Sequence, residues 1–93
     1  MRQAILLYTD WCGACRSMLS DFFLDLRDER PDQVAVEDIT AYSPIVGRLK
    51  PTKVPTVVFT EDGDEFYRIA CAVNKEFVEG ILDGDDPDES LLR

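Results

Sequence analysis

Histidine is absent from the sequence, and cysteine occurs only three times. A tetrahedral zinc site draws its ligands mainly from these two residue types, so a four-sulfur site would need two chains. The apolar run at 4–8 is far shorter than the ~20 residues of a membrane-spanning helix. No small-residue cleavage site follows it, as it would in a signal peptide. We therefore expect no bound metal, no membrane partner and a cytoplasmic location.

Basic residues are also scarce, with ten lysines and arginines against nineteen acidic residues and a net charge of −9. Such a surface repels nucleic acid and anionic membranes, so neither is an expected partner. Aspartate outnumbers glutamate by 12 to 7, and lysine occurs only at Lys50, Lys53 and Lys75. This bias fits either adaptation to high salt or a genome whose codons favour aspartate and arginine. The 93 residues, 45% of them apolar, provide one small domain with a modest core.

The spacing of apolar residues predicts alternating strands and helices. The expected elements are strands at 3–8, 33–38, 54–60 and 65–70, and helices at 12–28, 44–50 and 75–82. The order βαβαββα predicts an α/β fold with a four-stranded mixed sheet flanked by three helices, its first two strands parallel. We place this domain at residues 1–84, followed by an acidic C-terminal tail at 85–93. The tail is expected to be solvated, unless Leu91 and Leu92 dock on the body or on a partner.

Local signals mark the ends of these elements. Ser43-Pro44 is typical of a helix N-cap followed by proline at the first helical position, and Asn74 is expected to cap the last helix. Gly84 fits a helix C-cap. Asp62-Gly63 is a strong signal for a two-residue hairpin turn between the last two strands.

Two cysteines lie three positions apart, where the first predicted strand passes into the first predicted helix. The first, Cys12, is close to the helix N-terminus, where free N–H groups and the helix dipole favour a thiolate. The second, Cys15, lies one turn further on and near enough to close a disulfide. This spacing suits a dithiol–disulfide switch. Half of a metal site is the alternative, and the shortage of further ligands disfavours it.

The segment 11–15, Trp-Cys-Gly-Ala-Cys, resembles the active-site motif of the thioredoxin family. Val-Pro-Thr at 54–56 resembles the family's cis-proline element. The resemblance covers about residues 3–82 and implies a thioredoxin-like fold. The site residues that it implies are Cys12 as nucleophile, Cys15 as resolving thiol, and Trp11, Gly13, Ala14, Val54 and Pro55 around the substrate. Trp11 is then partly exposed beside Cys12 rather than part of the core.

The resemblance implies a protein-disulfide reductase that needs no cofactor of its own. Cys12 attacks a disulfide of a client protein, and Cys15 then resolves the mixed disulfide and releases the reduced client. A flavoprotein of the thioredoxin-reductase type is the expected electron donor, and the expected state is a monomer. Two alternatives stay open. One is a glutaredoxin-like redoxin that uses glutathione or another small thiol, and the other is a thioredoxin-like module for binding or assembly.

Three positions depart from the family's usual pattern. Leu6 stands where a buried aspartate is usual, and Val36 matches the position of a nearby lysine. Because the family's aspartate and lysine are both missing, no buried charge is left without a partner. The group thought to handle the proton of the resolving thiol is missing as well. Ala14 replaces a common proline, which leaves the reduction potential open. The Pro-Tyr pair typical of glutaredoxins is absent between the cysteines, and no convincing glutathione-binding residues are recognised.

Cys71 is the third cysteine. With a two-residue turn at Asp62-Gly63, the numbers of facing residues sum to 125, which sets Val54 opposite Cys71. A three-residue turn would set Pro55 opposite Cys71 instead. Either register predicts a third sulfur beside the substrate groove, within about 10 Å of Cys12. Its role is that of a small buried apolar residue or of a regulatory thiol.

Overall fold

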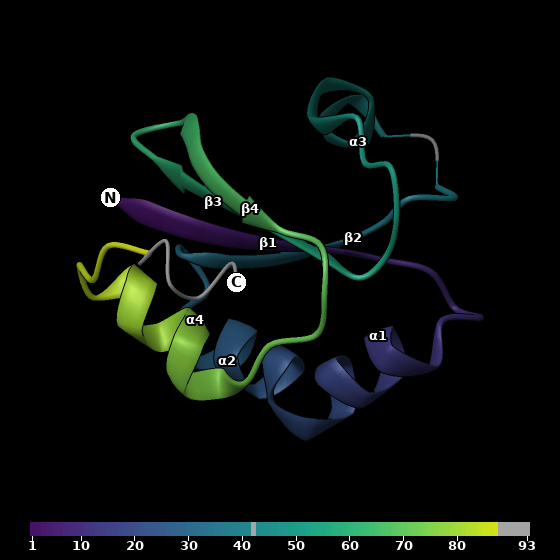
Figure 1. The fold of residues 1–93 in the computed structure, drawn as a ribbon, viewed down its shortest axis with the longest axis horizontal. Coiled ribbons are helices and arrows are strands. Elements are labelled where there is room, and N and C mark those ends of the chain that lie inside the picture. Colours follow the sequence, from purple (N-terminus) through teal and green to yellow (C-terminus); the bar gives the residue numbers. More distant parts are fainter. Residues whose placement is uncertain (42, 88–93) are drawn as a thin grey trace.

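A four-stranded mixed sheet forms the centre of the computed structural model, which describes residues 1–41 and 43–87 (Figure 1). The strands lie in the order β2-β1-β3-β4. Their bounds are β1 Arg2–Tyr8, β2 Val34–Asp38, β3 Thr56–Glu61 and β4 Asp64–Ile69. β1 runs parallel to β2 and antiparallel to β3, and β4 is antiparallel to β3. The predicted order of elements along the chain, the parallel first pair and the antiparallel last pair are thus confirmed.

Three helical stretches cover the sheet. The first runs without a break through α1 (Gly13–Met18), a π-helical turn η1 (Leu19–Phe23) and α2 (Leu24–Glu29). The others are α3 (Pro44–Leu49) and α4 (Lys75–Leu82). The first stretch and α4 lie on one side of the sheet and α3 on the other (Figure 1). None of the helices in the described residues is long and apolar enough to cross a membrane.

β1 is buried on both faces, as its apolar run predicted. Ala4 and Leu6 belong to the larger core, which α1, η1, α2 and α4 cover. Ile5 and Leu7 face the other way and pack with Leu49 of α3. No residue of this run from 4 to 7 is more than 5% exposed. Because alternate strand residues point to opposite faces, β1 forms the centre of both layers.

The helix predicted at 12–28 contains a π-helical turn that periodicity alone did not indicate. Its buried positions Met18, Phe22 and Leu26 recur every four residues. In an α-helix each step of four rotates a side chain by about 40° around the axis, so this stripe would drift off the core. The wider turn η1 offsets that drift, and Phe23 is buried there as well.

The hairpin between β3 and β4 turns at Asp62-Gly63, as predicted, with both residues at positive φ (52° and 92°). Glu61 faces Asp64 and Thr60 faces Glu65, as the two-residue turn requires. Beyond these pairs the register shifts by one residue. The predicted pairing of Val54 with Cys71 is therefore wrong.

A β-bulge at the Phe59/Thr60 step causes this shift, so that Phe59 pairs with Tyr67 and not with Phe66. The bulge turns Tyr67 toward the larger core, where its ring lies 6.0 Å from Phe59 and 6.5 Å from Phe77 between centroids. Phe66 stays 39% exposed, with the Arg2 guanidinium 4.6 Å from its ring centroid. The turn signal predicts the loop length, whereas the bulge depends on which aromatic ring fits the core.

The predicted caps are largely present. The Asn74 side chain accepts the Phe77 N–H at 2.9 Å, and Gly84 follows α4 with φ 115°. Ser43 occupies the N-cap position of α3 with Pro44 after it, but its hydroxyl makes no capping hydrogen bond.

The first two residues of the predicted tail contact the domain. Arg2 donates to the Asp85 carbonyl at 2.7 Å, and its guanidinium lies 3.3 Å from the Asp86 carboxylate. Residues 88–93, and with them Leu91 and Leu92, lie outside the described part of the chain.

Candidate active site

A strand, a turn and a helix N-terminus position the two neighbouring cysteines. β1 ends at Tyr8, and the Thr9 carbonyl then accepts the Cys12 N–H at 3.3 Å. Cys12 is the N-cap of α1, and its carbonyl accepts the Arg16 N–H at 3.0 Å. The motif therefore lies where the sequence predicted, at the carboxyl end of the central strand.

The two sulfurs have different surroundings. Cys12 is half-buried, and its Sγ accepts the backbone N–H of Cys15 at 3.2 Å. The side chain of Cys15 has no exposed surface. Burial, together with the hydrogen bond to Cys12, raises the pKa of the Cys15 thiol to about 11, so Cys15 keeps its proton at neutral pH. The site thus presents one accessible sulfur with an N–H donor and one protonated sulfur behind it.

The raised pKa of Cys15 predicts a loss of stability in alkali for the reduced protein. The pKa of an unfolded cysteine is ~8.5, whereas the pKa of folded Cys15 is about 11. Between these two pKa values only the unfolded state releases the proton. The contribution of the protonated Cys15 thiol to folding stability is therefore complete below the unfolded-state pKa, and it is lost as the pH rises toward the folded-state pKa. We expect a loss of about 3 to 4 kcal/mol in the free energy of unfolding, at ~1.4 kcal/mol per pKa unit.

Urea unfolding of the reduced protein over this pH range measures that loss. Cys15→Ala is the matched control, because it keeps every other titrating side chain and lacks this thiol. Subtracting its curve leaves the Cys15 contribution alone. Parallel curves for the two proteins would show that Cys15 does not ionise differently in the folded state.

Trp11, Gly13 and Ala14 form the exposed surface of the motif. Trp11 is 72% exposed and is therefore no part of the core. A Cβ built on Gly13 meets no atom within 4 Å, so this position is open to solvent. Ala14 lines a cavity of about 540 Å³. Met18 and Phe22 line it on the helix side, and residues 72–75 line the opposite side.

The bond between Val54 and Pro55 is cis, as expected. Pro55 directly precedes β3, whose first residue, Thr56, is the register partner of Leu7 in β1. This pairing places the proline at the same edge of the sheet as the two cysteines. Pro55 is buried and Val54 is half-buried, so Val54 is the more accessible of the two.

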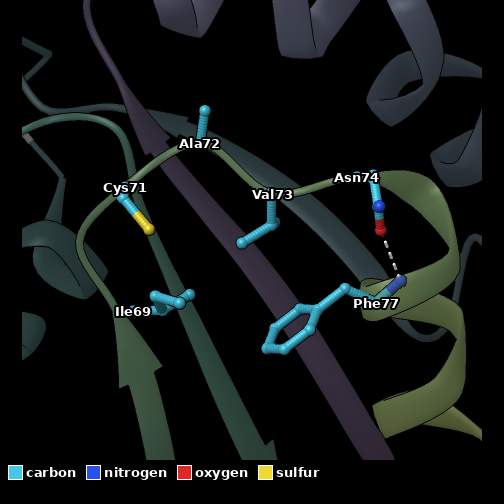
Figure 2. Close-up of a pocket in the computed structure, with 6 residues that line it drawn as sticks. All are labelled: Ile69, Cys71, Ala72, Val73, Asn74 and Phe77. Carbon is cyan, nitrogen blue, oxygen red and sulfur yellow. Dashed lines mark hydrogen bonds between the residues drawn. The ribbon is translucent and has the colours of Figure 1, made fainter. Parts of the chain in front are cut away.

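Cys71 is exposed, which corrects the expectation of a small buried residue. β4 ends at Ile69, so Cys71 lies beyond the sheet. Figure 2 shows its thiol directed into an open cavity of about 420 Å³, which Val73 and Phe77 also line. The shifted register, continued past β4, sets Cys71 opposite Pro55. A regulatory role and a short distance to Cys12 stay predictions.

Thr9 is a site residue that the sequence analysis did not single out. Its side chain is fully buried, and its Oγ1 has no hydrogen-bond partner among the described residues. Its backbone lowers the pKa of Cys15 and so opposes the effect of burial. The sequence signal that could have identified Thr9 was its position between the first predicted strand and the cysteine motif.

Across residues 1–41 and 43–87, no three His, Cys, Asp or Glu side chains are grouped to hold a metal.

The family model described as Thioredoxin matches residues 2–83. The chain belongs to the thioredoxin family. Thioredoxin membership and the observed fold support a thiol–disulfide oxidoreductase in general. Members of the family generally act on disulfides and are reduced by thioredoxin reductase.

Individual thioredoxins are similar to this chain over most of its length. A thioredoxin of Chlamydia pneumoniae is 28% identical over 76 residues, which are 81% of this chain and 74% of the relative. The structure of Fasciola hepatica thioredoxin superposes with a TM-score of 0.71 at 26% identity, covering 90% of this chain and 81% of that one. Oxidised mitochondrial thioredoxin 3 of Saccharomyces cerevisiae gives 0.66 at 29% identity, covering 88% and 77%. These matches confirm the predicted thioredoxin-like fold.

Proposed function

We propose that this chain reduces disulfides of client proteins by dithiol–disulfide exchange through Cys12 and Cys15. The observation that carries the proposal is the contrast between the two sulfurs. Cys12 is half-buried at the helix N-terminus and accepts an N–H bond. Cys15 is fully buried and protonated, one turn behind it. An accessible attacker and a protected resolver are what this chemistry requires.

Two exchange steps move two electrons to the client. The Cys12 thiolate attacks one sulfur of the client disulfide, and the other client sulfur leaves as a thiolate and takes up a proton. Cys15 then gives up its proton and attacks Cys12 Sγ, which breaks the mixed disulfide and releases the second client thiol. The products are a client dithiol and a Cys12–Cys15 disulfide.

Within residues 1–41 and 43–87, no charged group is dedicated to the proton of the resolving step. Leu6 and Val36 face each other on β1 and β2, where the family usually has an aspartate and a lysine nearby. The pKa of Cys15 is set mainly by burial, by its hydrogen bond with Cys12 and by the Thr9 backbone. No carboxylate or ammonium group is among these causes. We propose that the proton of Cys15 passes to water or to the departing client thiolate.

The surface around Cys12 supports a protein client. Trp11 offers an exposed aromatic ring on one side, and the cavity beside Ala14 offers an apolar floor. Val54, before the cis bond to Pro55, can present backbone groups to an extended client segment. We propose a monomer in a reducing compartment such as the cytoplasm, recharged by a flavoprotein of the thioredoxin-reductase type.

Alkylation tests the assignment of the two roles. In the reduced protein near neutral pH, iodoacetamide should label Cys12 at least about tenfold faster than Cys15, because the thiolate is the reactive form and Cys15 is buried and protonated. Peptide mapping by mass spectrometry measures both rates. Cys71 is exposed, so the experiment is repeated in Cys71→Ser. Equal labelling of Cys12 and Cys15 would reverse the proposed roles.

The electron source distinguishes the proposed function from its alternatives. Insulin reduction is measured with dithiothreitol, with NADPH and thioredoxin reductase, and with glutathione and glutathione reductase. Turnover with thioredoxin reductase supports the proposal. Turnover with glutathione alone identifies a glutaredoxin-like enzyme. If insulin is reduced with none of the three electron sources, the binding or assembly module is the remaining alternative.

A further inference from the structure

The charges of this acidic chain are unevenly distributed. Three segments, at 11–20, 39–60 and 66–75, contain no acidic residue. Together they hold six of the ten basic residues and so carry a charge of +6. The rest of the chain holds all nineteen acidic residues with four basic ones, which amounts to −15.

The fold brings parts of these three segments to the edge of the sheet where the cysteines lie. β3 is antiparallel to both β1 and β4, so the end of β1, the start of β3 and the end of β4 share one edge. Segment 11–20 follows β1, residues 50–55 lead into β3, and residues 70–75 follow β4. In Figure 1 these connections leave the sheet at the same end. Parts of 11–20 and 66–75 also line the cavity of about 540 Å³ beside Ala14.

Four cations of these segments are exposed: Arg16, Arg48, Lys50 and Lys53. We call this set the basic face. None of the four forms an ion pair with any residue in the described part of the chain, although the protein is rich in carboxylates. Arg16 directly follows Cys15, and Lys53 directly precedes Val54. Free positive charge therefore flanks the site from both the helix and the cis-proline loop.

Other basic side chains of the protein are neutralised. Arg2 contacts Glu61 at 2.9 Å, Arg30 contacts Asp83 at 2.8 Å and Arg68 contacts Glu65 at 2.6 Å. Lys75 lies 3.9 Å from Glu29. Among the described residues outside the basic face, only Arg27 on α2 is an exposed cation without an ion pair. Among the described residues, unpaired positive charge is thus concentrated in the basic face.

The end of β1 beside β2 is instead surrounded by carboxylates. The carboxylates of Asp38 and Asp10 act with burial, the larger cause, to raise the pKa of Tyr8 at the end of β1. Positive charge is consequently concentrated in the loop before Pro55, with exposed Lys50 and Lys53, rather than at the end of β2. A client with matching charge would place its acidic surface over that loop.

We infer that the clients of this chain are proteins with a negatively charged surface beside the disulfide, which docks on the basic face. The inference rests on the proposed function and adds the class of client. Complementary charge raises the rate of productive encounter and orients the partner. The net charge of −9 would by itself repel such a client. Unpaired cations in the segment after β1 and in the loop before β3 oppose that repulsion at short range.

Three synthetic peptides test the inference. Each contains the same disulfide loop, flanked by glutamate, glutamine or lysine, and the reduced protein is the reductant. At about 0.15 M salt the Debye length is ~8 Å, so the peptide senses the basic face more than remote carboxylates. We expect the glutamate peptide to be reduced at least about threefold faster than the glutamine peptide, and the difference to shrink near 1 M salt.

The outcomes separate the inference from the proposed function. Net charge alone predicts that the lysine peptide is the fastest, so that order, or equal rates, would overturn the inference. Failure to reduce even the glutamine peptide would instead overturn the proposed function.

A pair of matched variants locates the effect. Lys53→Gln and Arg27→Gln each remove one exposed, unpaired cation and change the net charge equally. Lys53→Gln should slow the glutamate peptide about twofold more than the glutamine peptide, whereas Arg27→Gln should not distinguish them. Equal effects of the two variants would show that only total charge matters, and would overturn the docking assignment.

Discussion

Replacing Cys12 with serine should slow protein-disulfide reduction by at least about a thousand-fold, because exchange requires a thiolate and a serine hydroxyl stays protonated. Cys15 cannot take over the attack, since it is fully buried and its pKa is raised to about 11. Cys15→Ser is the matched variant, with the same change of sulfur to oxygen one turn away. It should retain the first attack and stop at the mixed disulfide.

Mass spectrometry after a single turnover distinguishes the two variants. Cys15→Ser should gain one client molecule through a reducible bond on Cys12, and Cys12→Ser should gain none. Exposed Cys71 can exchange on its own, so both variants are also prepared with Cys71→Ser. Residual activity that vanishes in that background belongs to Cys71. Activity of Cys12→Ser that persists there would show that Cys12 is not the nucleophile.

The order of elements could be predicted because each has a strong local signal. The run at 4–8 is apolar at every position, and a strand buried on both faces requires that composition. Asn74 and Gly84 mark the ends of α4 through side-chain and backbone preferences that act within a few residues. The Cys-x-x-Cys motif was equally accessible, since its chemistry depends on a fixed spacing at one helix N-terminus.

Other features depend on contacts between distant segments, which no local signal reports. The bulge in the β3–β4 hairpin lets Tyr67 pack beside Phe59 and Phe77, and Phe77 comes from α4. The same bulge moves Cys71 out of its predicted register. The contact of Asp85 and Asp86 with Arg2 joins the two ends of the described chain. The basic face likewise becomes visible only when the sheet brings its segments to one edge.

Leu6→Asp should cost at least about 4 kcal/mol of folding stability, because it removes a buried leucine and places a carboxyl in an apolar core. Leu6 has no exposed surface and lies between Val36 on β2 and Val57 on β3. The family usually carries an aspartate here with a lysine nearby. This chain offers only valine, so we expect no gain in the rate of disulfide reduction.

The pH dependence of that loss separates charge from simple loss of packing. Burial should raise the pKa of the new carboxyl above its usual value of ~4. Stability is then greatest below that value and falls as pH rises toward the folded-state pKa, because only the unfolded state releases the proton. Leu6→Asn removes the same apolar contacts without a titrating group, so its stability should change with pH only as the wild type does.

A double variant provides the decisive comparison. Val36 is the register partner of Leu6 and is only half-buried, so a lysine at that position can reach both the new carboxylate and solvent. Leu6→Asp/Val36→Lys should regain part of the stability lost by Leu6→Asp, and urea unfolding of the reduced proteins measures this. A stable and faster single variant Leu6→Asp would show that the resolving thiol was limited by its missing carboxylate. That result would contradict our proposal that water or the departing client thiolate suffices for the Cys15 proton.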